Sequence, residues 1–506
     1  MEHYRRRLLF AALLIAGCKD PEPTARAETP APVPAKLSMP RQAVPAEPSG
    51  DRWYDFAFKS QKIGYLHARE EETTRDGGPA LHVTRASVMK VGRRDQDIRM
   101  ESTIQSWCRP DGAPLAFVHT RREGEQVREL RGEVVGKDFV VTTRIGDSVS
   151  EQRYPLRPGL MLASTLDVVH YGELSLGKVI EGEAISESEG DVQPYRAEVV
   201  EVLEEGDQLR YLVDELQAGI KSRSVVDPSG KIISTELPMM GASFERTTRE
   251  KALRFGDRVD IFSAALFSLP EPLPPNRSIE LLTVRLSTRS GIKPTVIEDA
   301  RQEVAWKGES ANLTLRAVTA PSKSAKIPVA DPELRTFLQA TPYEDLQDPE
   351  LKAAAKEAIK GETEVIRAAA KLVDLVYLHI TEKSLSRAFT SATEAWQSQV
   401  GDCTEHAVLF SALAKIVGIP TRLVTGLVYV GGARNQFGYH EWAEVWTGSG
   451  WHPVDPTFNQ LSADPTHIKF AVGQSDPTSL REAGVVAASL IGDLELALVT
   501  VERKGS

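Results

Sequence analysis

A cysteine, a histidine and an aspartate follow one another late in the chain, each inside a short, distinctive run. Cys403 lies in GDCTEHA, His440 in GYHEWAEVW and Asp455 in PVDPT. A thiol, an imidazole and a carboxylate are the groups that cysteine-based nucleophilic catalysis requires. The thiolate attacks, the imidazole moves the proton, and the carboxylate orients the imidazole. These residue types predict a thiol nucleophile, its base and the orienter of that base.

The cysteine segment is expected to begin a helix. Asp402 can cap a helix from Cys403 to about Val417, because apolar residues recur at helical spacing and Gly418 and Pro420 follow. A cysteine in the first turn meets unpaired backbone N–H groups and the positive end of the helix dipole. We therefore expect this helix to favour the thiolate of Cys403.

The histidine and aspartate segments are expected to form the arms of a hairpin that turns at residues 447–450, which read TGSG. If Thr447 pairs with Gly450, Asp455 lies opposite Trp442 and shares one face with His440. An aspartate that accepts one ring N–H of His440 leaves the other nitrogen free for the thiol.

A fourth run, GIPTRLVTGL, lies between the cysteine and histidine runs. Together the four runs resemble the core of bacterial transglutaminase-like proteins, which belong to the papain-fold thiol superfamily. The resemblance covers about residues 340 to 475, and several motifs in the right order make it more specific than a lone Cys or His. It implies a papain-like α+β catalytic domain with Cys403 as nucleophile, His440 as base and Asp455 as orienter. The matching runs span residues 401–407, 418–427, 438–446 and 453–457, and Asn459 stands where many relatives have glycine.

Other residues near the three leave alternatives open. His406 shares the helix of Cys403 and could be the base, although a residue on the nucleophile's own helix points beside the thiol rather than across a cleft. Three tryptophans of the hairpin could line a substrate cleft or fill the core. These tryptophans are Trp442, Trp446 and Trp451.

An oxyanion hole needs two donors. The backbone N–H of Cys403 is expected to be one, because the oxyanion develops beside the attacking sulfur. Gln397, Gln399 and Trp396 are candidates for the second, and the sequence does not choose among them.

The N-terminus predicts export and lipid attachment. Three arginines precede an apolar stretch over 8–16, which is too short to span a bilayer and is followed by Gly17 and Cys18. Residues 15–18 read IAGC and resemble the lipobox of bacterial lipoproteins, which implies a signal peptide over 1–18 and acylation of Cys18. Lys19 favours the outer membrane, facing the periplasm, over the inner membrane.

The remaining chain divides by composition. Residues 19–50 are rich in proline and predict a disordered tether. Residues 51–268 alternate between apolar and polar side chains and predict an antiparallel β-rich domain, with strands near 80–90, 98–107, 139–145 and 209–213. Residues 269–330 predict a β-type bridging segment with strands at 281–286 and 311–318. Residues 331–506 predict the catalytic domain, with helices over 348–359 and 364–380, another that opens at 391–394, and a closing strand at 494–502.

Charge and cysteine content narrow the function. The net charge of −10 argues against nucleic acid as a partner. Of three cysteines, Cys18 is assigned to lipid and Cys403 to catalysis, which leaves Cys108 as a buried strand residue without a disulfide framework. No zinc-like Cys/His spacing is present in the sequence, so we expect no metal and no cofactor.

These patterns together predict a lipid-anchored envelope thiol enzyme that acts on amide or peptide bonds. Hydrolysis is favoured because water is the default nucleophile, and transfer to an amine would instead make a cross-linking transglutaminase. The substrate is expected to be a peptide, a protein or a peptidoglycan peptide, and the sequence names no partner for the β domain. The alternative of another class is a non-catalytic scaffold that keeps the same fold.

Overall fold

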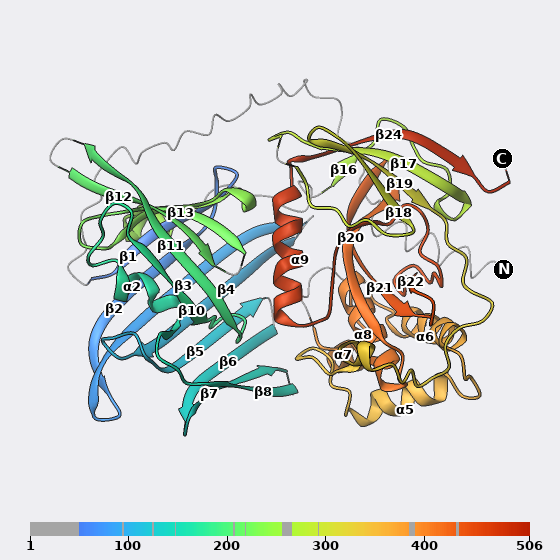
Figure 1. Ribbon diagram of the computed structural model, residues 1–506, viewed down its shortest axis with the longest axis horizontal. Helices are drawn as coiled ribbons and strands as arrows, with labels where there is room; N and C mark the ends of the chain where they lie inside the picture. Colours follow the sequence, from blue (N-terminus) through green and yellow to red (C-terminus); the bar gives the residue numbers. More distant parts are fainter. Residues whose placement is uncertain are drawn as a thin grey trace. The chain divides into compact units, whose positions relative to one another are not determined.

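A computed structural model describes residues 50–93, 96–123, 126–146, 148–205, 208–217, 219–255, 266–291, 293–383, 390–431 and 435–505. The described residues form two compact units, which cover 50–255 and 266–505 (Figure 1). The predicted signal peptide with Cys18, and the predicted tether up to residue 49, lie outside the described residues. Within the ranges given above, no helix combines the length and the apolar character needed to cross a bilayer.

The N-terminal unit is a single fifteen-stranded sheet. Neighbouring strands are antiparallel, except that β9 and β10 run parallel. The strands are β1 (Arg52–Phe58), β2 (Gln61–Arg75), β3 (Gly78–Arg93), β4 (Gln96–Cys108), β5 (Pro114–Glu123), β6 (Gln126–Val135), β7 (Asp138–Ile145), β8 (Ser148–Pro155), β9 (Leu160–Leu162), β10 (Val179–Ile185), β11 (Val192–Glu205), β12 (Gln208–Gln217), β13 (Ile220–Val226), β14 (Ile232–Leu237) and β15 (Ala242–Thr247). Short helices α2 (Leu166–His170) and α3 (Arg249–Ala252) accompany them.

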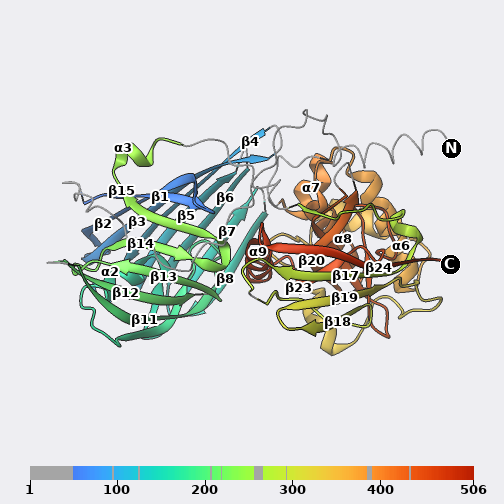
Figure 2. The same ribbon diagram turned by 90° about the horizontal axis from the view of Figure 1, so that it is seen from above.

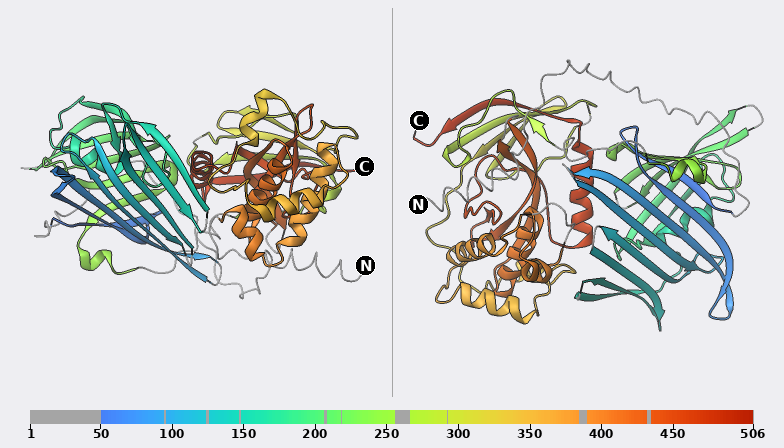
Figure 3. Two further views of the ribbon diagram at one scale, coloured as in Figure 1. Left: turned by 90° about the horizontal axis from the view of Figure 1, so that it is seen from below. Right: turned by 180° about the vertical axis from the view of Figure 1, so that it is seen from behind.

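This sheet curls into an open barrel. Its path ends at β8 on one side and at β9 on the other. Phe117 and Phe139 from β5 and β7 nevertheless share one buried cluster with Leu160, Leu162 and Ile185 from β9 and β10. Figure 3 shows the long strands wrapping around this interior. The unit is thus the antiparallel β-rich domain that the alternation predicted, and its sheet curls around a core.

The predicted strands of this unit fall inside β3, β4, β7 and β12. The turn between β2 and β3 contains Asp76 and Gly77, whose φ values are 53° and 78°. Glycine adopts this left-handed region freely, and aspartate adopts it more often than most residues do. Cys108 ends β4 and is fully buried, as expected. Burial raises the pKa of its thiol to about 11, so this cysteine is chemically quiet.

The C-terminal unit contains two sheets. One has the order β18-β19-β17-β24, from β17 (Ile279–Thr288), β18 (Gln302–Lys307), β19 (Ser310–Arg316) and β24 (Leu494–Arg503). The other has the order β16-β21-β20-β23, with β22 paired to β21; its strands are β16 (Phe267–Ser268), β20 (Thr421–Gly431), β21 (Gln436–Trp446), β22 (Trp451–Val454) and β23 (Ile468–Gly473). Side chains of both sheets share one hydrophobic core, and Figure 2 shows the two sheets from above.

The segment 269–330, expected to bridge two domains, lies inside this unit. Its two predicted strands pair with each other as β17 and β19. The chain's last strand, β24, pairs with the other edge of β17 and was predicted as a closing strand. The N-terminal and C-terminal ends of the unit are therefore joined in one sheet.

Helices form the rest of the C-terminal unit. They are α5 (Pro349–Ala358), α6 (Val365–His379), α7 (Ala392–Ser398), α8 (Cys403–Ile416) and α9 (Pro477–Leu490). The first four match the predicted helices, including the capping box at the start of α7. Helix α9 was not predicted. Helix α8 packs against β20 and β21 and is surrounded by α5, α6 and α7, so it is the buried helix of the unit.

Candidate active site

Cys403 is the first residue of α8. The Asp402 side chain accepts the backbone N–H of Thr404 at 2.9 Å, and the Glu405 side chain accepts the backbone N–H of Asp402 at 2.8 Å. These reciprocal bonds form a capping box, which fixes the start of the helix at the predicted residue. Cys403 itself is partly exposed.

The thiol of Cys403 has a high proton affinity in the resting site. Burial raises its pKa well above the ordinary value, and the negative charge of Asp402 raises it further, whereas a backbone hydrogen bond from Glu441 acts in the opposite direction. Desolvation and the Asp402 charge therefore act against the thiolate that the helix start was expected to favour. The thiol needs a base that takes its proton.

The hairpin that follows has the predicted register. The backbone N–H of Thr447 donates to the carbonyl of Gly450 at 3.0 Å, and Ala443 pairs with Val454 in β21 and β22. β21 pairs with β16 only at its first residues and with β22 only from Ala443 onward. In the described part of the chain, the stretch between them has no strand neighbour on that edge, and there the Glu441 backbone meets Cys403.

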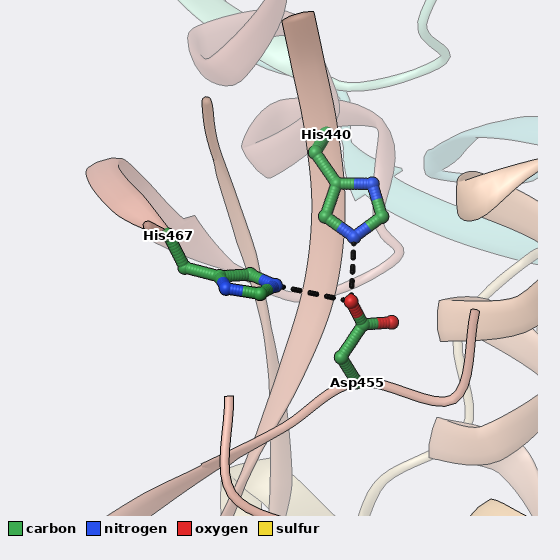
Figure 4. A group of neighbouring side chains, drawn as sticks. All are labelled: His440, Asp455 and His467. Carbon is green, nitrogen blue, oxygen red and sulfur yellow. Dashed lines mark hydrogen bonds and ion pairs between the residues drawn. The ribbon is translucent and has the colours of Figure 1, made fainter. Parts of the chain in front are cut away.

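His440 and Asp455 are in direct contact. Nε2 of His440 donates to Oδ2 of Asp455 at 2.9 Å, and both side chains are buried. Figure 4 shows the second ring nitrogen of His440 turned away from Asp455. The bond fixes the tautomer with the proton on Nε2, so Nδ1 is the nitrogen with a lone pair to offer.

Aromatic side chains hold the His440 ring in place. The ring stacks on Phe458 with centroids 4.9 Å apart and an interplanar angle of 21°. The ring centroid of Trp442, which is fully buried, lies 6.1 Å from that of His440. Trp442 is thus a core residue that fixes the histidine, whereas Trp446 and Trp451 pack on each other at 5.6 Å near the hairpin turn.

Asp455 accepts more than the bond from His440. The backbone N–H groups of Thr457 and Phe458 donate to its Oδ1 at 2.7 and 3.2 Å. Nε2 of His467 donates to its Oδ2 at 3.0 Å. Burial alone would raise the pKa of Asp455, but His440 and the other donors overcome this and lower it far below the ordinary value. Asp455 is therefore a permanent anion at the pH of any biological compartment.

His406 is excluded as a strong base by its surroundings. Its Nδ1 donates to the carbonyl of Asp402 at 2.5 Å, so its lone pair is on the fully buried Nε2. Burial, together with the nearby Lys383 cation, lowers its pKa to about 3. The structure thus favours the structural role over the alternative of a second base.

Two buried carboxyl groups flank the thiol. Burial, opposed by a hydrogen bond with Thr404 and aided by the charge of Asp402, raises the pKa of Glu441 to about 8. Burial likewise raises the pKa of Glu405 to about 8. Both groups are thus largely protonated at neutral pH, which limits the negative charge beside Cys403.

Lys383 is a residue near the site that sequence reasoning missed. Glu382 pairs with Val400, and the backbone N–H of Gly401 donates to the Glu382 carbonyl at 3.0 Å, so this segment runs beside the approach to Cys403. Nζ of Lys383 donates to the carbonyl of Thr457 at 2.7 Å. The side chain therefore connects the nucleophile's loop with the loop that follows Asp455.

The structure gives the surroundings of the three candidates for the second oxyanion donor, but no contact between any of them and Cys403. Gln397 and Gln399 are exposed, and the carbonyl of Gln399 accepts the N–H groups of Thr381 and Glu382. The indole of Trp396 stacks on His379 with centroids 3.7 Å apart. None of these contacts joins a candidate to Cys403, so the second donor stays open.

His467 and Asp464 were also missed by sequence reasoning. They lie in the loop before β23, in the run DPTH, where a buried histidine has no periodic or spacing signal that separates it from an ordinary core residue. Asn459, in the same loop, has a φ of 51°. This left-handed conformation gives a physical reason for the glycine that relatives have there.

Comparison with known proteins places the three residues within a family region. Residues 352–456 match the family model of the transglutaminase-like superfamily, a stretch that includes Cys403, His440 and Asp455. A search of curated proteins found no match. The C-terminal unit therefore contains a transglutaminase-like domain, joined in the same chain to a large N-terminal β domain.

Three solved structures are similar to parts of the chain. A candidate cysteine protease from Cytophaga hutchinsonii is 15% identical over 44% of this chain and 86% of its own, with a TM-score of 0.30. The periplasmic domain of TgpA from Pseudomonas aeruginosa is 15% identical over 40% of this chain and 94% of its own, with a TM-score of 0.28. A β-barrel-like protein from Brucella abortus is 11% identical over 39% of this chain and 94% of its own, with a TM-score of 0.29.

Proposed function

We propose that the protein is a thiol enzyme that acts on amide or peptide bonds through Cys403, His440 and Asp455. The observation that carries this proposal is the bond from His440 Nε2 to Asp455 Oδ2, which leaves Nδ1 as a base, next in sequence to the Glu441 backbone that meets the Cys403 sulfur. The transglutaminase-like family of this region supports the same class of chemistry. The domain would then have the papain-like α+β arrangement.

The reaction follows from these groups. Nδ1 of His440 takes the proton of the Cys403 thiol as the sulfur forms a bond to the carbonyl carbon, because the resting thiol is protonated. The imidazolium, held by Asp455, then gives its proton to the departing amine as the C–N bond breaks. Water or a second amine then attacks the thioester carbon, and His440 takes a proton from this nucleophile. As the C–S bond breaks, His440 gives that proton to the departing sulfur, which restores the thiol and releases the acid or the new amide.

Hydrolysis is the favoured outcome, with peptides, proteins or peptidoglycan peptides as substrates and no cofactor or metal. The test is to incubate the full chain with a glutamine-containing protein and a labelled primary amine. Release of ammonia or a cleaved peptide without label supports a hydrolase, and incorporation of the label makes the protein a cross-linking transglutaminase. Cys403→Ala should abolish either product, while Cys108→Ala, which alters a buried thiol of the other unit, should not.

A scaffold without catalysis would show neither product with any amide tested, and Cys403→Ala would then leave the chain's behaviour unchanged. Such a result, together with a Cys403 thiol no more reactive than Cys108, would overturn the enzymatic proposal.

We further propose that the enzyme is anchored in the bacterial cell envelope by lipid on Cys18, at the outer membrane facing the periplasm. The support is the lipobox-like run IAGC and the proline-rich 19–50 that follows, together with the periplasmic source of one similar structure. Cys18→Ser should move the protein from the membrane fraction to the soluble periplasmic fraction. Unchanged membrane association of this variant would contradict the lipid anchor.

A further inference from the structure

A second histidine stands behind the base. Nε2 of His467 and Nε2 of His440 donate to the same oxygen, Oδ2 of Asp455, at 3.0 and 2.9 Å (Figure 4). His467 and Asp455 have no solvent exposure. His440 comes from β21, Asp455 follows β22 and His467 precedes β23, so one carboxylate oxygen joins two imidazoles from separate elements.

The second nitrogen of His467 faces another carboxylate. Its Nδ1 lies 3.1 Å from the carbonyl oxygen and 3.4 Å from Oδ1 of Asp464. Burial alone would lower the pKa of His467, but Asp464 and Asp455 outweigh burial and raise it to about 9. Both ring nitrogens then donate, and the ring is a cation at neutral pH. The His467 cation therefore lies between two carboxylate anions, Asp464 and Asp455, and Asp455 in turn binds His440.

A residue from another segment, Arg301, holds the loop that contains His467. The buried guanidinium of Arg301, which precedes β18, donates to the carbonyls of Asp464 and His467 at 2.8 and 2.7 Å. Asp464 Oδ1 also accepts from Thr466, and its Oδ2 from Gln460. Among the described residues, Lys383 and His406 lie near Asp455 on the Cys403 side. Lys469, two residues after His467, pairs with Asp299 and Glu444.

We propose that His467 is a positioning residue of this site, a fixed buried cation that holds the Asp455 carboxylate and tunes how strongly His440 keeps a proton. The proposal rests on the proposed function, since His467 has this task only if His440 is the base. An isolated Asp455 anion would strengthen His440 as a base and make it reluctant to give its proton to the leaving amine. The His467 cation balances that charge without removing the hydrogen bond.

The size of the effect follows from the distance between the two rings, whose centroids are 5.6 Å apart. Two unit charges at that separation, at an effective dielectric constant of about 20 to 40, shift a pKa by about one to two units. Loss of the His467 cation favours every protonated form nearby. Removal of the proton from the Cys403 thiol through His440 should therefore need a higher pH.

The test measures the rate of Cys403 alkylation by iodoacetamide from pH 5 to pH 10 in the full-length chain, with peptide mapping to exclude Cys108. In His467→Gln the amide can still donate to Asp455, but the charge is gone. We expect the acid limb of its profile to move to higher pH by about one to two units. His452→Gln is the matched control, because His452 is buried in the same hairpin but bonds to Leu461 and Ser462. Its profile should coincide with that of the wild type.

A profile of His467→Gln that coincides with the wild type would overturn the proposal. The protonation state can also be read in the unaltered protein, from long-range proton–nitrogen NMR spectra of histidine-labelled protein at pH 7.5. We expect one buried histidine with both nitrogens protonated, assigned to His467 by its loss in His467→Gln or, if that variant does not fold, by its loss in Asp464→Asn. A neutral His467 would equally overturn the proposal.

The proposed function and the proposed role of His467 can be refuted separately. If His440→Gln alkylates as fast as the wild type, His440 is not the base and the proposed function fails. If His440→Gln is slow but His467→Gln retains the wild-type profile, only the role of His467 fails.

Discussion

Glu441 offers a quantitative test of the electrostatics beside the nucleophile. Its side chain is 7% exposed, and its Oε1 has no hydrogen-bond partner among the described residues. Burial, reinforced by Asp402, raises its pKa from 4.5 to about 8. Between those two pH values the folded protein keeps a proton on Glu441 that the unfolded chain has lost. The stability associated with that proton is fully present below pH 4.5 and is lost as the pH rises through 8.

The magnitude follows from the shift. Each pKa unit is worth about 1.4 kcal/mol, so the shift of Glu441 changes the free energy of unfolding by about 5 kcal/mol in all. This stabilisation is present below pH 4.5 and is gone above pH 8. Between pH 5 and pH 9 the wild type should lose about 4 kcal/mol of unfolding free energy through this residue. Glu441→Gln is neutral at every pH and lacks this loss. An amide left unpaired at Oε1 adds a cost of about 1 kcal/mol, but that cost does not vary with pH.

Hydrogen exchange followed by mass spectrometry suits this test, because peptides from α8 and β21 report on the C-terminal unit alone. Unfolding free energies at pH 5, 7 and 9, corrected for intrinsic exchange, should show Glu441→Gln gaining about 4 kcal/mol on the wild type across the series. Glu280→Gln, which alters an exposed residue of β17, is the control and should show no such trend. A difference between Glu441→Gln and the wild type that stays constant from pH 5 to pH 9 would refute the reasoning.

Three further changes have defined outcomes. Asp402→Asn keeps a capping oxygen but removes a charge that raises the Cys403 pKa. Alkylation of Cys403 at pH 8, followed by mass spectrometry of quenched samples, should therefore be several-fold faster than in the wild type. A slower rate would contradict this reasoning. Lys415→Met leaves Glu344, its fully buried partner at 2.5 Å, without a counter-charge. It should lower the free energy of unfolding in urea by about 3–5 kcal/mol. The double variant with Glu344→Leu should recover most of this loss, and no recovery would disprove the pairing argument. Gly426→Ala places a Cβ 1.9 Å from a carbonyl oxygen of β23 and should lower the stability of the C-terminal unit by at least about 1–3 kcal/mol in thermal unfolding; a neutral effect would show that the strands can separate.

The local parts of the site were predictable because they depend on local rules. Asp402 caps α8, and the register set at Thr447 brings Asp455 to His440, since caps and tight turns are encoded within a few residues. The same holds for the alternating strands of the N-terminal unit. The curling of that sheet, which brings β9 to the same core as β5 and β7, was not specified by the predicted antiparallel β-rich domain, since strand number and closure depend on pairing over long sequence distances.

The charge state of the site could not be predicted from local rules. The raised pKa values of Cys403 and Glu441 come first from desolvation by the assembled helices and strands, which acts against the effect expected from the helix start. His467 was invisible for a related reason. Its role arises only when the loop before β23 folds back onto Asp455 and Arg301 binds its carbonyl from the segment 269–330, which sequence patterns described as a bridge.

The central claim is that His440 activates Cys403, and its most direct test is the alkylation rate of Cys403 by iodoacetamide at pH 7.5 in the wild type and in His440→Gln. Cys108 in the same chain is the internal reference for an unactivated thiol. The account predicts that His440→Gln slows alkylation of Cys403 by about a hundredfold or more, because the thiol, whose pKa is raised by desolvation, loses the base that we propose takes its proton. Equal rates in the two proteins would contradict the assignment of His440 as the base and with it the proposed mechanism.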